Sequence, residues 1–135
     1  MDLIKDNIVL RSTADTGYFF KLFNLTDQQR DEFIKYALEF WDVYVNGLKQ
    51  GVVCHFVVNG HHGLEALADR TNGGPGFSNS VKIGRMAIGR IFSMTDKVRT
   101  CATVQDKVVN YLCKKIGFKK IGENYGMNVY EMENN

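Results

Sequence analysis

The segment Asn110–Glu133, NYLCKKIGFKKIGENYGMNVYEME, constrains the fold more than any other part of the chain. Apolar residues recur at helical spacing through QDKVVNYLCKKI, which predicts an amphipathic helix. Gly117 follows directly, and a glycine in this place typically ends a helix in the left-handed conformation. The two segments after it, FKKIGE and MNVYEM, have the residue pattern of strands. The chain is therefore expected to end in a helix that leads at once into a β-hairpin.

The composition fits one compact domain that covers residues 1–135, because 44% of the residues are hydrophobic and only one is proline. The 17 basic and 15 acidic residues nearly balance, and a net charge of +2 gives no general electrostatic case for binding nucleic acid. The sequence has neither an apolar run of the ~20 residues that a membrane span needs nor the pattern of a secretory signal. We therefore expect a cytoplasmic protein that does not bind membranes.

Strand and turn signals fill the first half of the chain. DNIVLRS predicts a first strand, and YFFKLF predicts a short helix that faces the core or forms a lid. TDQQRDEFIKYALEF predicts a longer helix, which Thr26 and Gln29 begin as a capping box. Over the range Trp41–Arg70, the segments WDVYV, GVVCHFVV and LEALADR predict a three-stranded antiparallel meander, with turns at the signals NG and NGHHG.

The glycine-rich segment NGGPGFSNS separates this half from a second amphipathic helix. That helix is expected over Val81–Phe92, with Lys82, Arg85 and Arg90 pointing outward. VRTCATV then predicts a strand before the C-terminal helix and hairpin. The expected order is β, α, β-β-β, loop, α, β, α, β-β, which places the chain in the mixed α/β (α+β) class.

This order, together with the segment LCKKIGFKKIG, resembles the GCN5-related N-acetyltransferases (GNAT). The C-terminal half of that family often carries the pattern N-x-x-A-x-x-L-Y-x-K-x-G-F followed by two strands. This chain matches the pattern at Leu112, Lys115, Gly117 and Phe118. The resemblance implies a GNAT-like mixed, mostly antiparallel central sheet of about seven strands flanked by helices. It also implies acetyl-CoA as the cofactor, bound between the central strands, and an amine as the acceptor.

Three positions depart from the family pattern. Asp106 and Val109 stand where the family has asparagine and alanine, and Cys113 stands where many members have a tyrosine that acts as general acid. Tyr111 lies two residues away, which on a helix is roughly 200° of rotation, so it does not simply replace that hydroxyl. Cys113 and Tyr111 are the candidate catalytic residues of this helix, and neither is assigned to the acid step. Cys113 is also a candidate nucleophile, and the alternative is a thiol packed in the core.

A strand, a glycine-rich loop and a helix start form an arrangement that binds phosphate, because unpaired N–H groups and the positive helix end converge there. The segment RTNGGPGFSNS fits this arrangement, although Pro75 has no N–H to offer. The resemblance assigns the pyrophosphate of the cofactor to this loop. The alternative is a surface turn whose helix is capped by Ser78 or Asn79. The candidate cofactor-binding residues are Arg70, Asn72, Gly73, Gly74, Gly76, Ser78 and Asn79.

The segment LEALADR offers two carboxylates for acid–base chemistry. Glu65 and Asp69 are four residues apart, which on a strand places both side chains on one face. Transfer of an acetyl group to an amine requires removal of a proton from the nitrogen, and carboxylates serve as bases for this step. The resemblance makes Glu65 the first candidate because the family often draws its base from this strand. The alternative is a pair of exposed carboxylates on a polar strand face.

The histidines and cysteines do not indicate a metal site or a disulfide framework. None shows the closely spaced pairs of a structural zinc site, and three widely spaced cysteines fit a reducing compartment. We therefore expect no metal cofactor. The lysines around Gly117 are expected to form a solvated face. The residues considered are His55, His61, His62, Cys54, Cys101, Cys113, Lys114, Lys115, Lys119 and Lys120.

The sequence leaves two functions open. The first is an N-acetyltransferase that moves an acetyl group from acetyl-CoA to an amine of unknown identity. The second is a non-catalytic, phage-encoded protein with the same fold, similar to head-assembly proteins, which binds virion or assembly proteins in the host cytoplasm or the virion. Both are compatible with a homodimer. A fold alone does not separate them, because one fold hosts unrelated functions.

Overall fold

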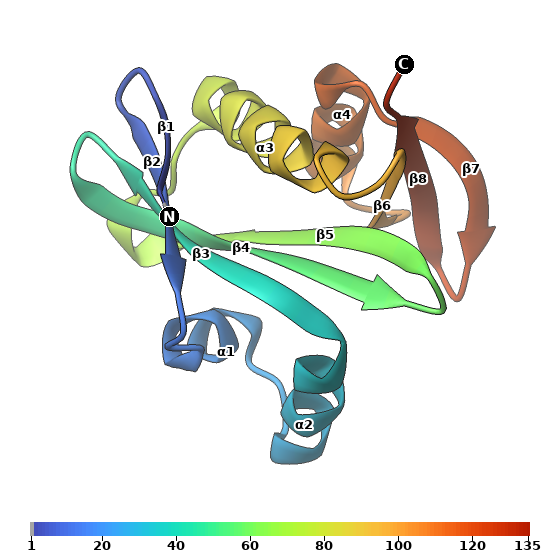
Figure 1. The fold of residues 1–135 in the computed structure, drawn as a ribbon, viewed down its shortest axis with the longest axis horizontal. Coiled ribbons are helices and arrows are strands. Elements are labelled where there is room, and N and C mark those ends of the chain that lie inside the picture. The colour runs from blue at the N-terminus through green and yellow to red at the C-terminus, as the bar shows by residue number, and fades with distance from the viewer. Residues whose placement is uncertain (1) are drawn as a thin grey trace.

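A computed structural model describes residues 2–135. One eight-stranded sheet runs through the molecule in the order β1-β2-β3-β4-β5-β6-β8-β7 (Figure 1). The strands are β1 (Asp2–Lys5), β2 (Ile8–Thr13), β3 (Ala37–Val45), β4 (Leu48–Val58), β5 (His61–Ala68), β6 (Lys97–Thr103), β7 (Lys119–Asn124) and β8 (Met127–Glu133). The helices are α1 (Gly17–Phe23), α2 (Asp27–Tyr36), the short 3-10 helix η1 (Arg70–Asn72), α3 (Phe77–Phe92) and α4 (Lys107–Ile116).

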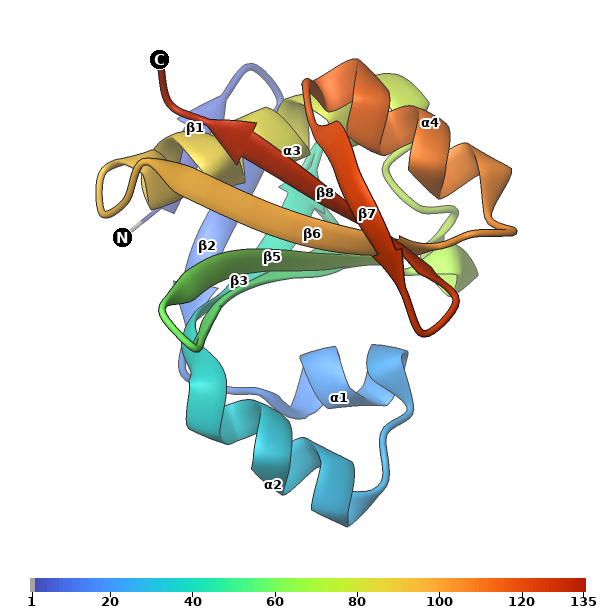
Figure 2. The same ribbon diagram turned by 90° about the vertical axis from the view of Figure 1, so that its right-hand side faces the viewer.

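The helices form two layers on opposite faces of the sheet. Helices α3 and α4 cover one face, whereas α1 and α2 lie against the other (Figures 1 and 2). The larger core lies under α3 and α4 and includes Trp41 and Tyr130, each only 1% exposed. The smaller core lies under α1 and α2 and is rich in phenylalanine, with Phe19 at its centre. Each face of the sheet therefore has its own packed layer.

The sheet is antiparallel at every pair except β5 and β6, which run parallel. This confirms the predicted mixed, mostly antiparallel sheet flanked by helices. It has eight strands rather than about seven, because Asp2–Lys5 forms a hairpin with β2 through a turn at Asp6, whose φ is 54°. The single paired position between β5 and β6 is Gly63 with Arg99. The two strands then separate toward their C-terminal ends.

The helix predicted over residues 26–40 extends further than the helix in the structure. Helix α2 begins with the predicted capping box, in which Gln29 N donates to Thr26 Oγ1, but it stops at Tyr36. The next residues join β3 because Ala37 pairs with Phe56 of β4, and Phe40 packs its ring 5.0 Å from that of Phe19. Pairing with distant strands therefore overrides the local helical pattern here.

Three further predictions differ from the structure. His61 and His62 belong to β5 and not to a turn, because the Asn-Gly pair before them is sufficient to reverse the chain. Helix α3 begins four residues before Val81, with Gly76 and neither Ser78 nor Asn79 at its N-cap. Arg90 does not point outward, because it turns to the sheet and its Nη2 lies 3.1 Å from Glu39 Oε1.

The C-terminal segment folds as predicted. Helix α4 ends at Ile116, and Gly117 adopts a φ of 126°, which permits the sharp turn. Phe118 then returns to the core, where it is 4% exposed, and β7 and β8 form the hairpin. Strand β8 pairs with β6, so the hairpin lies beside the separation between β5 and β6. Within residues 2–135, no helix has the length and apolar character that crossing a membrane requires.

Candidate functional site

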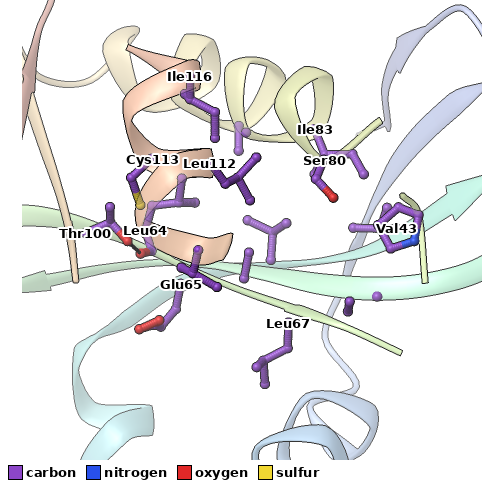
Figure 3. Close-up of a pocket in the computed structure, with 18 of the residues that line it drawn as sticks. Val43, Leu64, Glu65, Leu67, Ser80, Ile83, Thr100, Leu112, Cys113 and Ile116 are labelled. Atoms are coloured by element: carbon purple, nitrogen blue, oxygen red, sulfur yellow. Dashed lines mark hydrogen bonds between the residues drawn. The ribbon is translucent and has the colours of Figure 1, made fainter. Parts of the chain in front are cut away.

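A cavity lies where β5 and β6 separate. It has a volume of about 320 Å³ and is enclosed by β5, β6 and the facing sides of α3 and α4 (Figure 3). Side chains from both faces of the sheet line it: Leu64 and Ile83 belong to the α3/α4 core, whereas Glu65 and Leu67 point to the α1/α2 side. The cavity therefore connects the two sides of the sheet through the gap between two neighbouring strands.

The edge of β5 along this gap carries free backbone groups. Thr100 of β6 donates its hydroxyl to the carbonyl oxygen of Leu64 at 2.8 Å, which shows that the peptide groups of Leu64 face β6. Peptide groups alternate in direction along a strand, so those of Ala66 and Ala68 face the same gap. In the described sheet β6 pairs with β5 only at Gly63, and these groups have no strand partner there. An extended chain with amide groups can pair with such an edge.

Glu65 points away from α4 and Cys113, toward the side of the sheet covered by α1 and α2 (Figure 3). Its register partner on β4 is Cys54, which belongs to the phenylalanine-rich core on that side. Burial raises the pKa of Glu65 to about 7, because the charged carboxylate loses its hydration in this apolar setting. A carboxylate with this pKa can accept a proton at neutral pH and release it again.

Asp69 lies on the same side of the sheet as Glu65 but is held by three hydrogen bonds. Its carboxylate accepts from the Tyr18 hydroxyl at 2.8 Å, from the Thr71 hydroxyl at 2.6 Å and from the Thr71 N–H at 3.1 Å. These bonds, first that from the Thr71 hydroxyl, then that from Tyr18 and last that from the Thr71 N–H, lower the pKa of Asp69. Asp69 thus caps the short helix η1 and ties it to α1. Glu65 is the carboxylate of the pair that faces the cavity.

The predicted cofactor loop lies at one end of the cavity. Gly73, Gly74 and Gly76 have φ values of 88°, 69° and 84°, which favour glycine and let the chain reverse before α3. Gly76 is the N-cap of α3 and has no side chain to accept from the first turn of the helix. The first N–H groups of α3 are therefore available to a ligand. Arg70 and Pro75 line the cavity beside them.

The other polar residues of this loop make local bonds. Asn72 Nδ2 donates to the carbonyl oxygen of Lys49 at 3.2 Å, and Asn79 Nδ2 donates to that of Pro75 at 2.9 Å. Ser78 lies in the first turn of α3. The amide side chains of Asn72 and Asn79 thus hold the loop in shape, and the groups that remain for a ligand are mainly backbone N–H groups and the guanidinium of Arg70.

The two candidate catalytic residues of α4 lie in different places. Cys113 is buried in the cavity wall, and burial together with the Glu65 carboxylate raises the pKa of its thiol to about 11. The thiol is therefore protonated at neutral pH, which suits a proton donor better than a nucleophile. Tyr111 lies outside the cavity lining, is 58% exposed and stacks on Phe77, with ring centroids 5.4 Å apart.

Two features of the site were not predicted from the sequence. One is Thr100, whose bond to Leu64 orients the edge of β5. The other is Asn110, whose Oδ1 accepts from the Tyr130 hydroxyl at 2.6 Å and from Asn128 Nδ2 at 2.8 Å, while its Nδ2 donates to the carbonyl oxygen of Thr103. Asn110 joins α4 to β6 and β8. Apart from the carbonyl oxygen of Asp106, four residues before it, its partners lie 7 to 20 residues away, so no local pattern identifies this junction.

A histidine pair lies on β4 and β5, toward the turn that joins these two strands. His55 is fully buried, and its Nε2 lies 2.7 Å from His62 Nδ1. No atom among residues 2–135 partners the Nδ1 of His55. Burial, followed by the nearby His62 and Arg90, lowers the pKa of His55 to about 4. Among residues 2–135, no group of three or more histidine, cysteine, aspartate or glutamate side chains is arranged to hold a metal ion.

The His55 pKa predicts a pH dependence of stability. The unfolded chain binds a proton at His55 near the ordinary pKa of 6.5, whereas the folded protein resists protonation until about pH 4. The free energy of unfolding should therefore fall as the pH is lowered from 6.5 to 4, by about 2–3 kcal/mol from this residue. Urea unfolding at both pH values, compared between the wild type and His55→Gln, measures this contribution. His61→Gln is the matched control, and an equal pH dependence in wild type and His55→Gln would contradict the prediction.

No sequence model of a known protein family matches the chain, and no curated protein matches it in sequence. Solved structures do share its fold. The aminoglycoside acetyltransferase AAC(6')-Ib in complex with coenzyme A has a TM-score of 0.74 and 13% identity, over 93% of this chain and 94% of that chain. The ribosomal-protein-S5-alanine acetyltransferase from Vibrio fischeri has a TM-score of 0.72 and 12% identity, over 99% and 97% of the two chains.

The ribosomal L7/L12 alpha-N-protein acetyltransferase RimL, in complex with coenzyme A, has a TM-score of 0.71 and 14% identity, over 98% of both chains. The chain therefore has the fold of the GNAT acetyltransferases, as its element order and C-terminal segment predicted. At these identities the likeness concerns the fold, and one fold hosts unrelated chemistries.

Proposed function

We propose that this protein is an N-acyltransferase that moves an acetyl group from acetyl-CoA to an amine. The observation that carries the proposal is the gap between β5 and β6, which has free backbone groups on its edge and a raised-pKa carboxylate, Glu65, facing it from one side. Two substrates can meet in this gap from opposite faces of the sheet. The coenzyme A complexes among the structures with this fold support the choice of donor.

The donor fits the α3/α4 side of the gap. Its pantetheine arm contains two amides, which can pair with the peptide groups of Ala66 and Ala68 on the free edge of β5. Its pyrophosphate would lie on the first turn of α3, where the N–H groups after Gly76 are free and Arg70 is near. The loop residues Gly73 and Gly74 have positive φ values and carry no side chain that could occupy this position. When bound, acetyl-CoA supplies the thioester carbonyl that an amine attacks.

The acceptor fits the α1/α2 side, where Glu65 lies. An amine is protonated in water, so it must lose a proton before it can attack a carbonyl carbon. With a pKa of about 7, Glu65 is partly ionised at neutral pH and can take that proton. Asp69 is committed to η1 and Tyr18, and its role is to hold the loop. We therefore assign Glu65 as the general base and Asp69 as a positioning residue.

The leaving thiolate needs a proton, and we assign its donation to a thiol of the cavity wall. Cys113 lines the cavity and carries a thiol whose pKa is about 11, so it holds its proton at neutral pH. We assign it the donor role that a tyrosine has in many members of the family that the sequence resembles. Tyr111 is not part of this step, because its ring stacks on Phe77 outside the cavity lining.

Titration with acetyl-CoA and with coenzyme A by calorimetry tests the donor assignment. The wild type should bind both at micromolar concentration, and Gly74→Glu should weaken binding by at least about tenfold, because a carboxylate would repel the pyrophosphate. Gly60→Glu is the matched control, since Gly60 has a similar φ of 78° but lies in the turn between β4 and β5, before the first residue of β5. Equal binding by wild type and Gly74→Glu would refute the loop assignment, and no binding by the wild type at millimolar ligand would refute the proposal.

The alternative role in phage head or virion assembly gains no support from these comparisons, because the structures named above are all described as acetyltransferases. An assembly role predicts a stable complex with a virion protein and no need for coenzyme A. The homodimer and the cytoplasmic location stay predictions. The identity of the amine stays open. The calorimetric titration separates the two roles, since only the enzyme requires the donor.

A further inference from the structure

An exposed thiol lies on the far border of the gap from Glu65. Cys101 belongs to β6, and it lines the cavity together with Glu65. On the same strand, Val98 and Ala102 belong to the core under α3 and α4. Side chains alternate between the two faces of a strand, so Cys101, an odd number of residues from both, points to the opposite side of the sheet. This is the α1/α2 side, to which Glu65 also points (Figure 3).

The register of the two strands places Cys101 level with Glu65. Strands β5 and β6 run parallel and pair at Gly63 and Arg99, and Glu65 and Cys101 each follow two residues later. The hydroxyl of Thr100 bonds to the carbonyl oxygen of the residue before Glu65 at 2.8 Å, in agreement with this register. The carboxyl and the thiol therefore border the gap at the same height, one from each strand and on the same face.

The charge of Glu65 acts on the Cys101 thiol. Burial, and after it the Glu65 carboxylate, raises the pKa of Cys101, whereas Arg99 acts in the opposite direction. The thiol therefore keeps its proton at neutral pH and becomes a nucleophile when a neighbouring base removes that proton. Glu65, whose pKa is about 7, is such a base. The two side chains form a pair of nucleophile and base across the gap.

The other two cysteines are placed differently. Cys54 is fully buried in the phenylalanine-rich core. Cys113 is 6% exposed and belongs to the core under α3 and α4, on the opposite side of the sheet from Glu65. Of the three cysteines, only Cys101 combines an exposed thiol, a position on the gap and the same face as the base.

We propose that Cys101 is itself an acetyl acceptor: with acetyl-CoA in the gap and no amine on the α1/α2 side, its thiol takes the acetyl group and becomes a thioester. Glu65 removes the thiol proton, the sulfur bonds to the carbonyl carbon, and the bond from that carbon to the coenzyme A sulfur breaks. The proton ends on the coenzyme A thiol, so the step needs no oxidant, reductant or further reactant. Because one thioester replaces another, free coenzyme A reverses the transfer. This inference rests on the proposed function, since it requires acetyl-CoA in the gap.

Incubation of the whole protein with acetyl-CoA, followed by mass spectrometry of the intact chain and of its peptides, tests the proposal. The wild type should gain one acetyl group at Cys101, which neutral hydroxylamine or excess coenzyme A removes. Cys101→Ala should gain none, and Glu65→Gln should gain it about 10²- to 10⁴-fold more slowly, because the base is absent. The matched control adds Thr103→Cys to Cys101→Ala. It moves the thiol about 7 Å along the same exposed face of β6, away from Glu65, and should stay unmodified.

Alkylation with iodoacetamide gives a measurement that does not depend on transfer. Cys101 should react in the free protein, whereas Cys54 and Cys113 should react only after unfolding, because they are buried. Coenzyme A at about ten times its Kd should slow the alkylation of Cys101 by about tenfold, since only the unliganded fraction reacts.

The outcomes separate this inference from the proposed function. Binding of acetyl-CoA in the calorimeter without acetylation of Cys101 would overturn the inference and leave the proposed function standing. Acetylation of Cys54, of Cys113 or of the displaced thiol, or an equal rate in Glu65→Gln, would overturn it as well. The same holds when coenzyme A binds and does not protect Cys101 from alkylation. No binding of acetyl-CoA at millimolar concentration would refute the proposed function and this inference together.

Discussion

Replacing Glu65 with glutamine is expected to lower kcat for acetyl transfer by about 10²- to 10⁴-fold, the usual contribution of a general base. Glutamine has nearly the same shape but cannot accept the proton from the amine. The binding of acetyl-CoA should change little, because Glu65 faces the α1/α2 side and the donor is assigned to the other (Figure 3). Steady-state kinetics and calorimetry on the same variant measure the two effects separately.

The comparison with Asp69→Asn distinguishes the two carboxylates. Asp69 accepts three hydrogen bonds that hold η1 and α1, so its loss should lower stability and raise KM more than it lowers kcat. In the wild type, kcat/KM should rise with pH through about 7 as Glu65 ionises, and this limb should be absent from Glu65→Gln. A glutamine variant with kcat within twofold of the wild type would remove Glu65 from the mechanism.

The same Glu65 variant has a predicted effect on stability that does not depend on activity. In the wild type, the pKa of the Glu65 carboxyl is 4.5 in the unfolded chain and about 7 in the folded protein, so folding favours its protonated form. The contribution of Glu65 to the free energy of unfolding is fully present below pH 4.5 and is lost as the pH rises through 7. The free energy of unfolding of Glu65→Gln minus that of the wild type should therefore increase by about 1–3 kcal/mol between pH 4.5 and pH 8. Urea unfolding at both pH values measures this, and a pH-independent difference would contradict the raised pKa.

Much of the fold follows from local signals in the sequence. The capping box at Thr26 and Gln29, the Asn-Gly turn before β4 and the glycine that ends α4 are all confirmed, because each acts through neighbours within a few residues. The strand pairing around them was expected to be mostly antiparallel for the same reason, since short turns join successive strands. The resemblance to the GNAT family rested on this order and on the C-terminal segment.

The rest depends on contacts between distant parts of the chain. Residues 37–40 have a helical pattern and become a strand because two neighbouring strands pair with them. The gap in the sheet arises because Gly63 pairs with Arg99 and the next residues of β5 do not continue the ladder. Glu65 acquires its raised pKa from the layer that buries it, which no spacing reveals. The sequence identified Glu65 as a candidate base, but it did not reveal the burial that raises the pKa of this carboxyl.

The shape of the gap also depends on Gly51, and replacing it with alanine is expected to cost about 2–3 kcal/mol of stability. A Cβ atom at this position would lie 2.5 Å from the carbonyl oxygen of Leu67, which is closer than real Cβ atoms approach any atom. That oxygen belongs to the backbone of β5, whose ladder with β4 pairs Gly51 with Ala68 and Val52 with Leu67. It cannot move aside without a shift of the strand itself, so glycine is required here by close approach.

Gly122→Ala provides the matched control. Gly122 also lies in a strand, β7, but a Cβ atom there would meet nothing within 4 Å, so alanine should be neutral or stabilise by up to about 1 kcal/mol. Urea unfolding of the two variants measures the difference. Because Gly51 lines the cavity and β5 carries the edge assigned to the pantetheine arm, Gly51→Ala should also weaken acetyl-CoA binding, whereas Gly122→Ala should not. Equal stability of the two variants would show that β5 can shift freely, and the edge of β5 would then be too mobile to orient a donor.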